Sequence, residues 1–128
     1  MSGTGELTTR QAVIAFCLSL GEAVYEDYPF DDDNWTVMRH RGNKKGFAFL
    51  YEYQGRLQVN VKCDPAGISF WRDSFDGVLP AYHMNKAHWN TIVLDGSVPD
   101  ADVKAMLSDS YSLTRPMPKR KKSQKEKD

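Results

Sequence analysis

The stretch WTVMRHRGNKKGFAFLYEYQGRLQVNVK, residues 35–62, decides the fold of this sequence. Three of its runs, 35–41, 47–53 and 57–62, combine aromatic and β-branched residues with polar ones. Alternation with a period of two and this composition are typical of β-strands. Two short glycine-containing segments separate the runs, and their residues favour tight turns. We therefore predict an antiparallel meander of three strands.

Helices are predicted on both sides of this meander. Thr8 and Gln11 form a capping-box signature, and apolar residues then recur at helical spacing, which predicts a first helix over 9–20. Asp64 and Pro65 begin a second, shorter helix, because aspartate caps helices and proline fits their first turn.

The rest of the chain is predicted to complete the sheet and to add a third helix. Residues 79–84 and 89–94 resemble strands and are expected to add one or two strands to the meander. Pro99 begins a helix with a face at helical spacing. That face consists of Val103, Met106, Leu107 and Ser110. The predicted fold class is α+β, with an antiparallel sheet packed against N-terminal, middle and C-terminal helices.

Length and charge divide the chain into one domain and a tail. The 128 residues suffice for one ordinary domain, and a content of 41% hydrophobic and 27% charged residues is typical of a globular protein. Residues 1–115 hold eleven basic against fifteen acidic residues, which excludes a uniformly basic surface. Residues 116–128 hold six basic against two acidic residues. We predict that 116–128 is a disordered basic tail, which either adds phosphate affinity or only improves solubility.

Targeting signals and paired-cysteine motifs are not found in the sequence. No apolar stretch approaches the roughly 20 residues that span a bilayer, and the first residues lack the features of a signal peptide. Cys17 and Cys63 stand alone, which favours reduced, buried thiols over a disulfide or a zinc site. We expect a cytoplasmic protein that does not associate with membranes.

Common motifs of nucleotide-binding proteins, hydrolases and zinc enzymes are also missing. His83 and His88 have no cysteine or suitably spaced carboxylate nearby to share a metal ion, and no nucleophile to activate as a general base. Asp31, Asp32 and Asp33 are interpreted as a solvated loop. We predict a non-enzymatic protein without a metal ion or another cofactor.

The segment over 80–92 combines aromatic, imidazole, amide and ammonium groups in one short link. Its distinctive residues are Tyr82, His83, Met84, Asn85 and Lys86, followed by His88, Trp89 and Asn90. With this segment, and with the sequences KCDP at 62–65 and LDG at 94–96, the chain resembles the MmcQ/YjbR family of small bacterial proteins. The resemblance extends over about 9–113.

This resemblance implies a CyaY-like, or frataxin-like, α+β fold and a double-wing arrangement for binding DNA. It does not imply the iron-binding role of frataxin relatives, because the first predicted helix, TTRQAVIAFCLSL, has no acidic ridge.

A basic region within the meander suits the backbone of double-stranded DNA. We predict that Lys44 and Lys45 form a hairpin wing that neutralises phosphates. A positive stripe of strand residues is expected to extend this wing. The stripe consists of Arg39, Arg41, Arg56 and Lys62.

The segment over 82–90 is predicted to form a second contact surface. Lys86 would bind the DNA backbone, and Asn85 or Asn90 would recognise base edges. Structural explanations compete with these roles, because strand cations often only cover a solvated face and large aromatic residues more often belong to a core. His83 and Asn85 can likewise satisfy buried backbone groups.

The competing function is a small-molecule or protein-binding module. In this hypothesis, aromatic side chains line a pocket between sheet and helices. The candidate residues are Trp35, Tyr51, Tyr53, Trp71, Tyr82 and Trp89.

Overall fold

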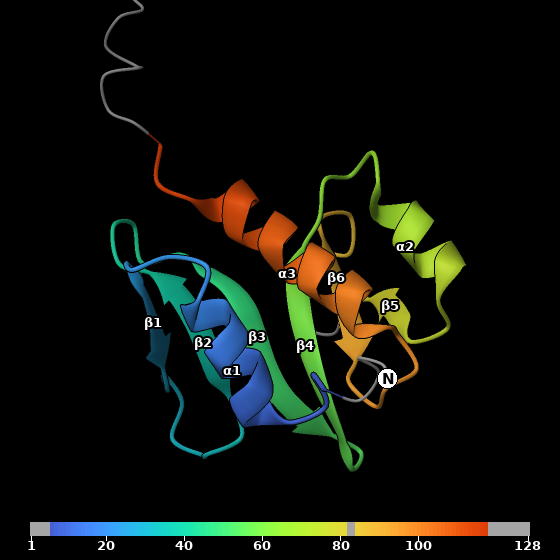
Figure 1. Ribbon diagram of the computed structural model, residues 1–128, viewed down its shortest axis with the longest axis horizontal. Helices are drawn as coiled ribbons and strands as arrows, with labels where there is room; N and C mark the ends of the chain where they lie inside the picture. Colours follow the sequence, from blue (N-terminus) through green and yellow to red (C-terminus); the bar gives the residue numbers. More distant parts are fainter. Residues whose placement is uncertain (1–5, 82–83, 118–128) are drawn as a thin grey trace, which may run out of the picture.

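The computed structural model describes residues 6–81 and 84–117, in which three helices accompany one antiparallel sheet (Figure 1). The strands are β1 (Val24–Asp27), β2 (Thr36–His40), β3 (Gly46–Tyr53), β4 (Arg56–Lys62), β5 (Val78–Pro80) and β6 (Trp89–Val93). The helices are α1 (Arg10–Leu18), α2 (Ile68–Ser74) and α3 (Asp100–Thr114). The predicted α+β class is confirmed.

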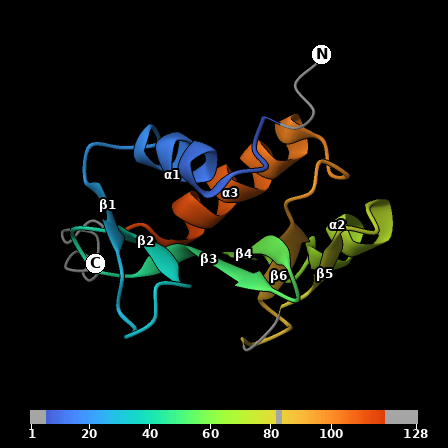
Figure 2. The same ribbon diagram turned by 90° about the horizontal axis from the view of Figure 1, so that it is seen from below.

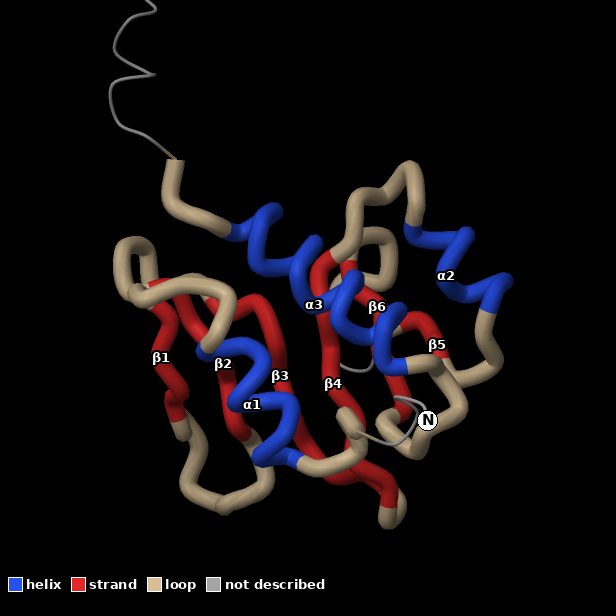
Figure 3. Tube along the Cα trace, in the orientation of Figure 1, coloured by secondary structure: helices blue, strands red, loops and turns tan. Residues whose placement is uncertain are grey.

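The strands follow the order β1-β2-β3-β4-β6-β5 across the sheet, and every neighbouring pair is antiparallel. Helices α1 and α3 lie across one face of this sheet, as Figure 2 shows. Helix α2 lies instead beside β5, at the edge of the sheet (Figure 3). No helix of the described residues covers the other face of the sheet, and we call it the helix-free face.

The core fills the space between the sheet and the two helices α1 and α3. Successive strand residues point to opposite faces, so Met38, Leu50 and Val61 share the helix-covered side. All three side chains are fully buried. The predicted apolar face of α3 is confirmed, since its four members are buried.

A buried serine fixes α3 on the sheet. The Ser110 hydroxyl donates a hydrogen bond of 2.6 Å to the carbonyl of Phe47 and accepts one of 2.8 Å from the backbone N–H of Lys62. The pairing of β2 with β3 shifts next to Phe47, as in a β-bulge. The hydroxyl thus satisfies backbone groups of two adjacent strands, which favours one position of α3.

The predicted meander is confirmed as β2, β3 and β4. Its second turn is formed by Gln54 and Gly55 with φ angles of 54° and 78°, the conformation of a two-residue type I′ hairpin. The sheet nevertheless has six strands rather than four or five. Strand β1 falls in a segment that the sequence pattern marked as a polar connection, and β5 is only three residues long.

Two predicted helix starts are displaced. Thr9, and not Thr8, caps α1, because its side chain accepts a hydrogen bond of 3.1 Å from the backbone N–H of Ala12. Asp64 accepts a similar bond from Ala66 in a turn that precedes α2. The helix itself begins at Ile68, three residues after the predicted start at Pro65. Both cysteines are buried free thiols. None of the helices in the described part of the chain is long and apolar enough to cross a membrane.

Candidate functional site

The helix-free face carries some of the residues that the sequence suggested for binding, together with polar residues that it did not suggest. Strand alternation places Arg56, Gln58, Asn60 and Lys62 of β4 on this face. Neighbouring strands contribute aromatic and hydroxyl side chains in register with them. These residues are Phe49, Tyr51 and Tyr53 from β3, and Trp89 and Thr91 from β6.

A buried polar cluster lies at the centre of the helix-free face. The Tyr51 hydroxyl donates to Oδ1 of Asn60 at 2.9 Å and to Oε1 of Gln58 at 3.2 Å. The Thr91 hydroxyl donates to the same Asn60 oxygen at 2.6 Å. Because all four side chains are buried, their hydrogen bonds fix the centre of the face in one arrangement.

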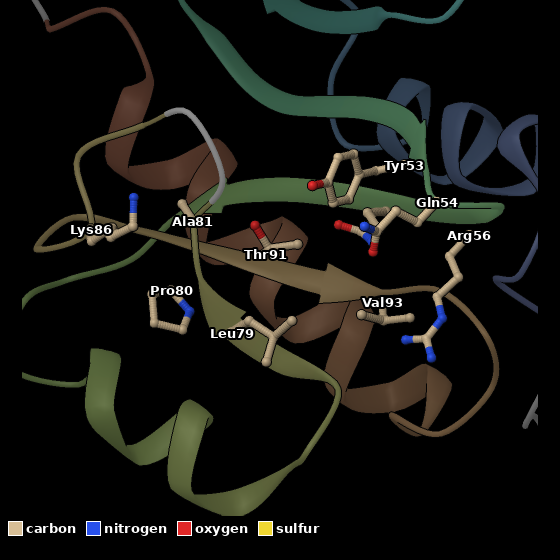
Figure 4. Close-up of a pocket in the computed structure, with 10 residues that line it drawn as sticks. Tyr53, Gln54, Arg56, Leu79, Pro80, Ala81, Lys86, Thr91 and Val93 are labelled. Carbon is tan, nitrogen blue, oxygen red and sulfur yellow. The ribbon is translucent and has the colours of Figure 1, made fainter.

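A cleft of about 480 Å³ lies beside this cluster, above β5 and β6 (Figure 4). Figure 4 shows Lys86 and Arg56 at its two ends, with the hydroxyl groups of Thr91 and Tyr53 between them. Its remaining lining residues are Gln54, Gln58, Leu79, Pro80, Ala81 and Val93. The cleft thus combines two cations and several hydrogen-bonding groups with an apolar wall.

Part of the charge of Arg56 already acts on a neighbouring carboxylate. Hydrogen bonds from Ser97 hold the pKa of Asp95 below its ordinary value, and the nearby guanidinium of Arg56 lowers it further.

We use the name cleft cations for Arg56 and Lys86.

The segment that leads into β6 is anchored by Arg72 of α2. The Nε of Arg72 donates to Oδ1 of Asn90 at 2.6 Å, and a terminal nitrogen donates to the carbonyl groups of Lys86 and Trp89. The amide of Asn90 also lies 3.4 Å from Sγ of Cys63 and 3.5 Å from the Ile68 carbonyl. A single guanidinium therefore ties α2 to the segment that supplies Lys86 to the cleft.

A tight turn gives this segment its shape. The Asn85 carbonyl accepts hydrogen bonds from the backbone N–H groups of His88 and Trp89, and its side chain accepts one of 2.8 Å from Ala87. The ring of Trp89 then packs edge-to-face against Phe49, with ring centroids 5.6 Å apart. Asparagine suits this position because its side chain can bond the backbone two residues further on.

A second group of cations lies at the turn between β2 and β3, which we call the basic hairpin. Its exposed cations are Arg41, Lys44 and Lys45. Lys44 has a φ of 63°, and its backbone N–H closes the turn by donating to the His40 carbonyl at 2.7 Å. The Asn43 amide donates to the Thr114 carbonyl at 2.9 Å, which ties the turn to the last residue of α3.

Arg39 lies on β2, whereas Arg41, which falls in the predicted strand over 35–41, lies in the turn that follows β2. The two arginines also differ in their contacts. Arg39 forms an ion pair of 2.7 Å with Asp27 and also donates to the Lys44 carbonyl. Arg41 lies over the ring of Tyr25, 4.9 Å from its centroid, and is exposed. Only Arg41 therefore keeps its charge available for an external anion.

Comparison with known proteins decides the family. The YjbR family model matches residues 18–113, which is most of the chain. This protein belongs to the YjbR family.

Relatives of this YjbR-family protein include YjbR of Escherichia coli K12, which is 33% identical over 79 residues, covering 62% of this chain and 67% of that protein. YyaQ of Bacillus subtilis 168 is 31% identical over 100 residues, which cover 70% of this chain and 84% of that protein. Both are described as uncharacterised.

Solved structures share the fold of this YjbR-family protein. A Deinococcus radiodurans protein with a DUF419 domain superposes with a TM-score of 0.79 at 28% identity, covering 93% of this chain and 88% of that one. A Pseudomonas syringae protein superposes with a TM-score of 0.77 at 28% identity, and the superposition covers 84% of this chain and 99% of that one.

The lysine-rich end of this YjbR-family chain lies beyond the matched region but leaves the fold beside the basic hairpin. A Cβ atom on Gly42 would lie only 2.8 Å from Cγ of Pro116, so this proline packs directly on the turn. Figures 1 and 2 both show the end of α3 close to the turn between β2 and β3. Residues 118–128 of the predicted tail lie outside the described residues.

Several predicted roles need correction in this YjbR-family fold. Asn90 is fully buried and bonded to Arg72, so it cannot reach a DNA base. The predicted positive stripe is not continuous, because Arg39 is paired with Asp27 and the buried Gln58 and Asn60 separate Arg56 from Lys62. Tyr82 and His83 lie outside the described residues.

Arg72 is a residue whose importance the sequence did not reveal. It lies in the second helix, where a lone arginine among apolar residues is a signal of a buried polar partner. Within residues 6–81 and 84–117, no three His, Cys, Asp or Glu side chains are grouped so that they could hold a metal ion.

Proposed function

We propose that this YjbR-family protein binds double-stranded DNA through the basic hairpin and without catalysing a reaction. The observation that carries this proposal is the juxtaposition of Arg41, Lys44 and Lys45 with Pro116, where the lysine-rich sequence leaves the domain. Neither lysine forms an ion pair within the described part of the chain. Their charges are therefore available for phosphate groups.

The attachment of the basic hairpin to the domain favours its role as a DNA-binding wing. The bond from Asn43 to the Thr114 carbonyl and the contact of Gly42 with Pro116 fix the turn against the end of α3. A turn held in this way loses little conformational freedom when it binds, which favours affinity. Its cations would bind the phosphate backbone and would not by themselves recognise a base sequence.

The lysine-rich sequence adds positive charge to the chain after Pro116, which packs on the basic hairpin. Residues 116–128 carry a net charge of +4, whereas residues 1–115 carry −4. Binding of a polyanion to an acidic domain requires that its cations be concentrated locally. The basic hairpin meets this requirement within the domain, and the sequence that follows Arg115 carries a further excess of positive charge.

The test is fluorescence-anisotropy titration of duplex DNA at several salt concentrations between about 50 and 200 mM. Lys44→Glu combined with Lys45→Glu should weaken binding and flatten the slope of log K against log salt by about one to two units. The matched control is Arg56→Glu combined with Lys86→Glu, which changes the net charge equally at the cleft. If both double variants lose the same amount of DNA affinity, the basic hairpin is not a specific DNA-binding wing.

A chain that ends at Met117 keeps the contact between Gly42 and Pro116 and removes the lysine-rich sequence, so it separates the basic hairpin from the tail. Binding that survives this truncation and still depends on Lys44 and Lys45 supports a wing on the domain. Binding that disappears with the tail would assign the phosphate affinity to residues 118–128 alone.

A second candidate function is the binding of a small organic anion in the cleft. The cleft cations favour it, because they lie at two ends of one hollow of about 480 Å³ with hydroxyl groups between them. This volume is in the range of small-molecule sites. Isothermal titration with citrate and with adenosine monophosphate tests the idea, and the Arg56→Glu, Lys86→Glu variant should abolish the heat of binding.

A further inference from the structure

An aromatic hollow of about 530 Å³ lies beside the polar cluster, near the loop between β1 and β2. Its lining residues are Phe30, Asp32, Trp35, Phe49 and Met84. Three of these five residues are aromatic, and Asp32 carries the single formal charge of the set. We call this hollow the aromatic cage.

The rings of the cage are set at angles to one another. The rings of Phe30 and Trp35 are nearly perpendicular, at 79°, with centroids 5.9 Å apart. Phe49 forms a third aromatic wall and Met84 contributes a thioether. Aromatic side chains that line one hollow from different directions offer aromatic surface to a bound cation, which such rings attract.

Two walls of the cage are rigid. Trp35 stacks on the buried Tyr51 with centroids 4.4 Å apart, and the hydroxyl of Tyr51 is in turn fixed by Asn60. Phe49 packs against Trp89 and crosses over Gly46, where a Cβ atom would lie 2.7 Å from its Cζ. Glycine at this position leaves the space that the ring of Phe49 occupies.

The third wall, Phe30, is exposed and is not needed for the core of the fold. Phe30 has 55% of its surface accessible to solvent and does not belong to the hydrophobic core. Because Phe30 lines a hollow with two fixed aromatic walls and remains exposed, its ring is accessible to a ligand in that hollow.

The charge of the cage distinguishes it from the cleft. Asp32 lines the hollow, and its Oδ1 accepts a hydrogen bond of 3.1 Å from the backbone N–H of Asn34. Asp31 and Asp33 flank it in the sequence, which makes this loop strongly negative. A carboxylate at the rim of an aromatic hollow attracts organic cations and repels anions.

We infer that the aromatic cage binds a small organic cation with a quaternary or alkylated ammonium group. The rings of Phe30, Trp35 and Phe49 surround the alkylated nitrogen, and Asp32 contributes an opposite charge at the rim. This inference does not depend on DNA binding, because none of the basic-hairpin residues lines the cage.

The test compares choline with 3,3-dimethylbutan-1-ol, a neutral molecule of nearly the same shape, in isothermal titration with the full chain. Choline should bind at least tenfold more tightly than the alcohol, because only choline gains from the rings and the carboxylate. Equal affinity for the two probes, or no choline binding up to about 10 mM, would overturn the inference.

Matched variants locate the site. Asp32→Asn keeps an oxygen that accepts the bond from Asn34 but removes the charge, so it should weaken choline binding several-fold and leave the alcohol unaffected. Asp31→Asn removes a neighbouring charge that does not line the hollow and should change choline binding far less. Phe30→Leu keeps an apolar side chain on the exposed wall and should also weaken choline binding. If Asp31→Asn and Asp32→Asn have equal effects, the cage is not the site.

Discussion

Replacing Asn90 with alanine tests whether the residues of the 82–90 segment serve structure or DNA recognition. Asn90 is fully buried, and its carboxamide oxygen accepts a hydrogen bond of 2.6 Å from the guanidinium of Arg72. A hydrogen bond to a charged group stabilises a protein by about 1.5–3 kcal/mol. The contacts of its amide with Cys63 and Ile68 are long and add little. We expect the variant to lose about 3 kcal/mol of unfolding free energy once the small cavity is included.

This loss should be visible in thermal unfolding followed by circular dichroism. For the 110 described residues, 1 kcal/mol corresponds to about 4 °C in Tm, so the expected decrease is about 12 °C. The matched control is Asn85→Ala, because Asn85 is exposed and its side chain accepts one bond, from Ala87. That variant should lose less than about 1 kcal/mol.

DNA binding of the same two variants completes this test. If Asn90→Ala unfolds within about 3 °C of the natural protein and yet loses affinity for duplex DNA, the structural assignment of Asn90 is wrong. Equal stability losses for Asn85→Ala and Asn90→Ala would also contradict it, because the contact with Arg72 would then contribute nothing specific.

Three further predictions concern His40, Cys17 and Gly46. Burial lowers the pKa of His40, whose ring nitrogen lies 2.8 Å from the Thr114 hydroxyl; the unfolded chain therefore binds the proton more readily, and stability should fall as pH drops below about 6.5. Urea unfolding at pH 7.5 and 5.5 measures this fall, which His40→Gln should reduce. Burial raises the pKa of Cys17 to about 12, so a thiol reagent at pH 8 should modify it only after denaturant is added. Gly46→Ala should cost about 1–3 kcal/mol in urea unfolding, because the new methyl group would meet the ring of Phe49.

The parts of the fold that could be predicted from sequence are those with a regular pattern and local signals. The meander combined alternation with two turn sequences, and α3 combined an initial proline with apolar residues at helical spacing. Strand β1 has neither signal, since its sequence VYED is short and half acidic. It is a strand because it pairs with β2 and because Asp27 meets Arg39 across the pair, and both contacts depend on the tertiary fold.

The binding residues were harder to predict than the fold for the same reason. Arg39 and Arg41 look equivalent in the sequence, but a carboxylate from β1 neutralises only Arg39. Asn85 and Asn90 also look equivalent, although one is exposed in a turn and the other is buried under α2. Residue type and spacing identified a functional region, whereas the availability of each side chain depends on neighbours that are distant in sequence.

The contacts of Arg72 explain how a segment can be structural and still determine a binding site. Its guanidinium holds the carbonyl groups of Lys86 and Trp89 while it satisfies Asn90. Loss of Asn90 would therefore release one end of the segment that carries a cleft cation, and the cleft should lose affinity together with stability. Loss of the Lys86 charge alone should remove affinity and leave stability nearly unchanged, because its exposed ammonium group has no described partner in the fold. These different responses distinguish the residues that hold the cleft in shape from the residues that contact its ligand.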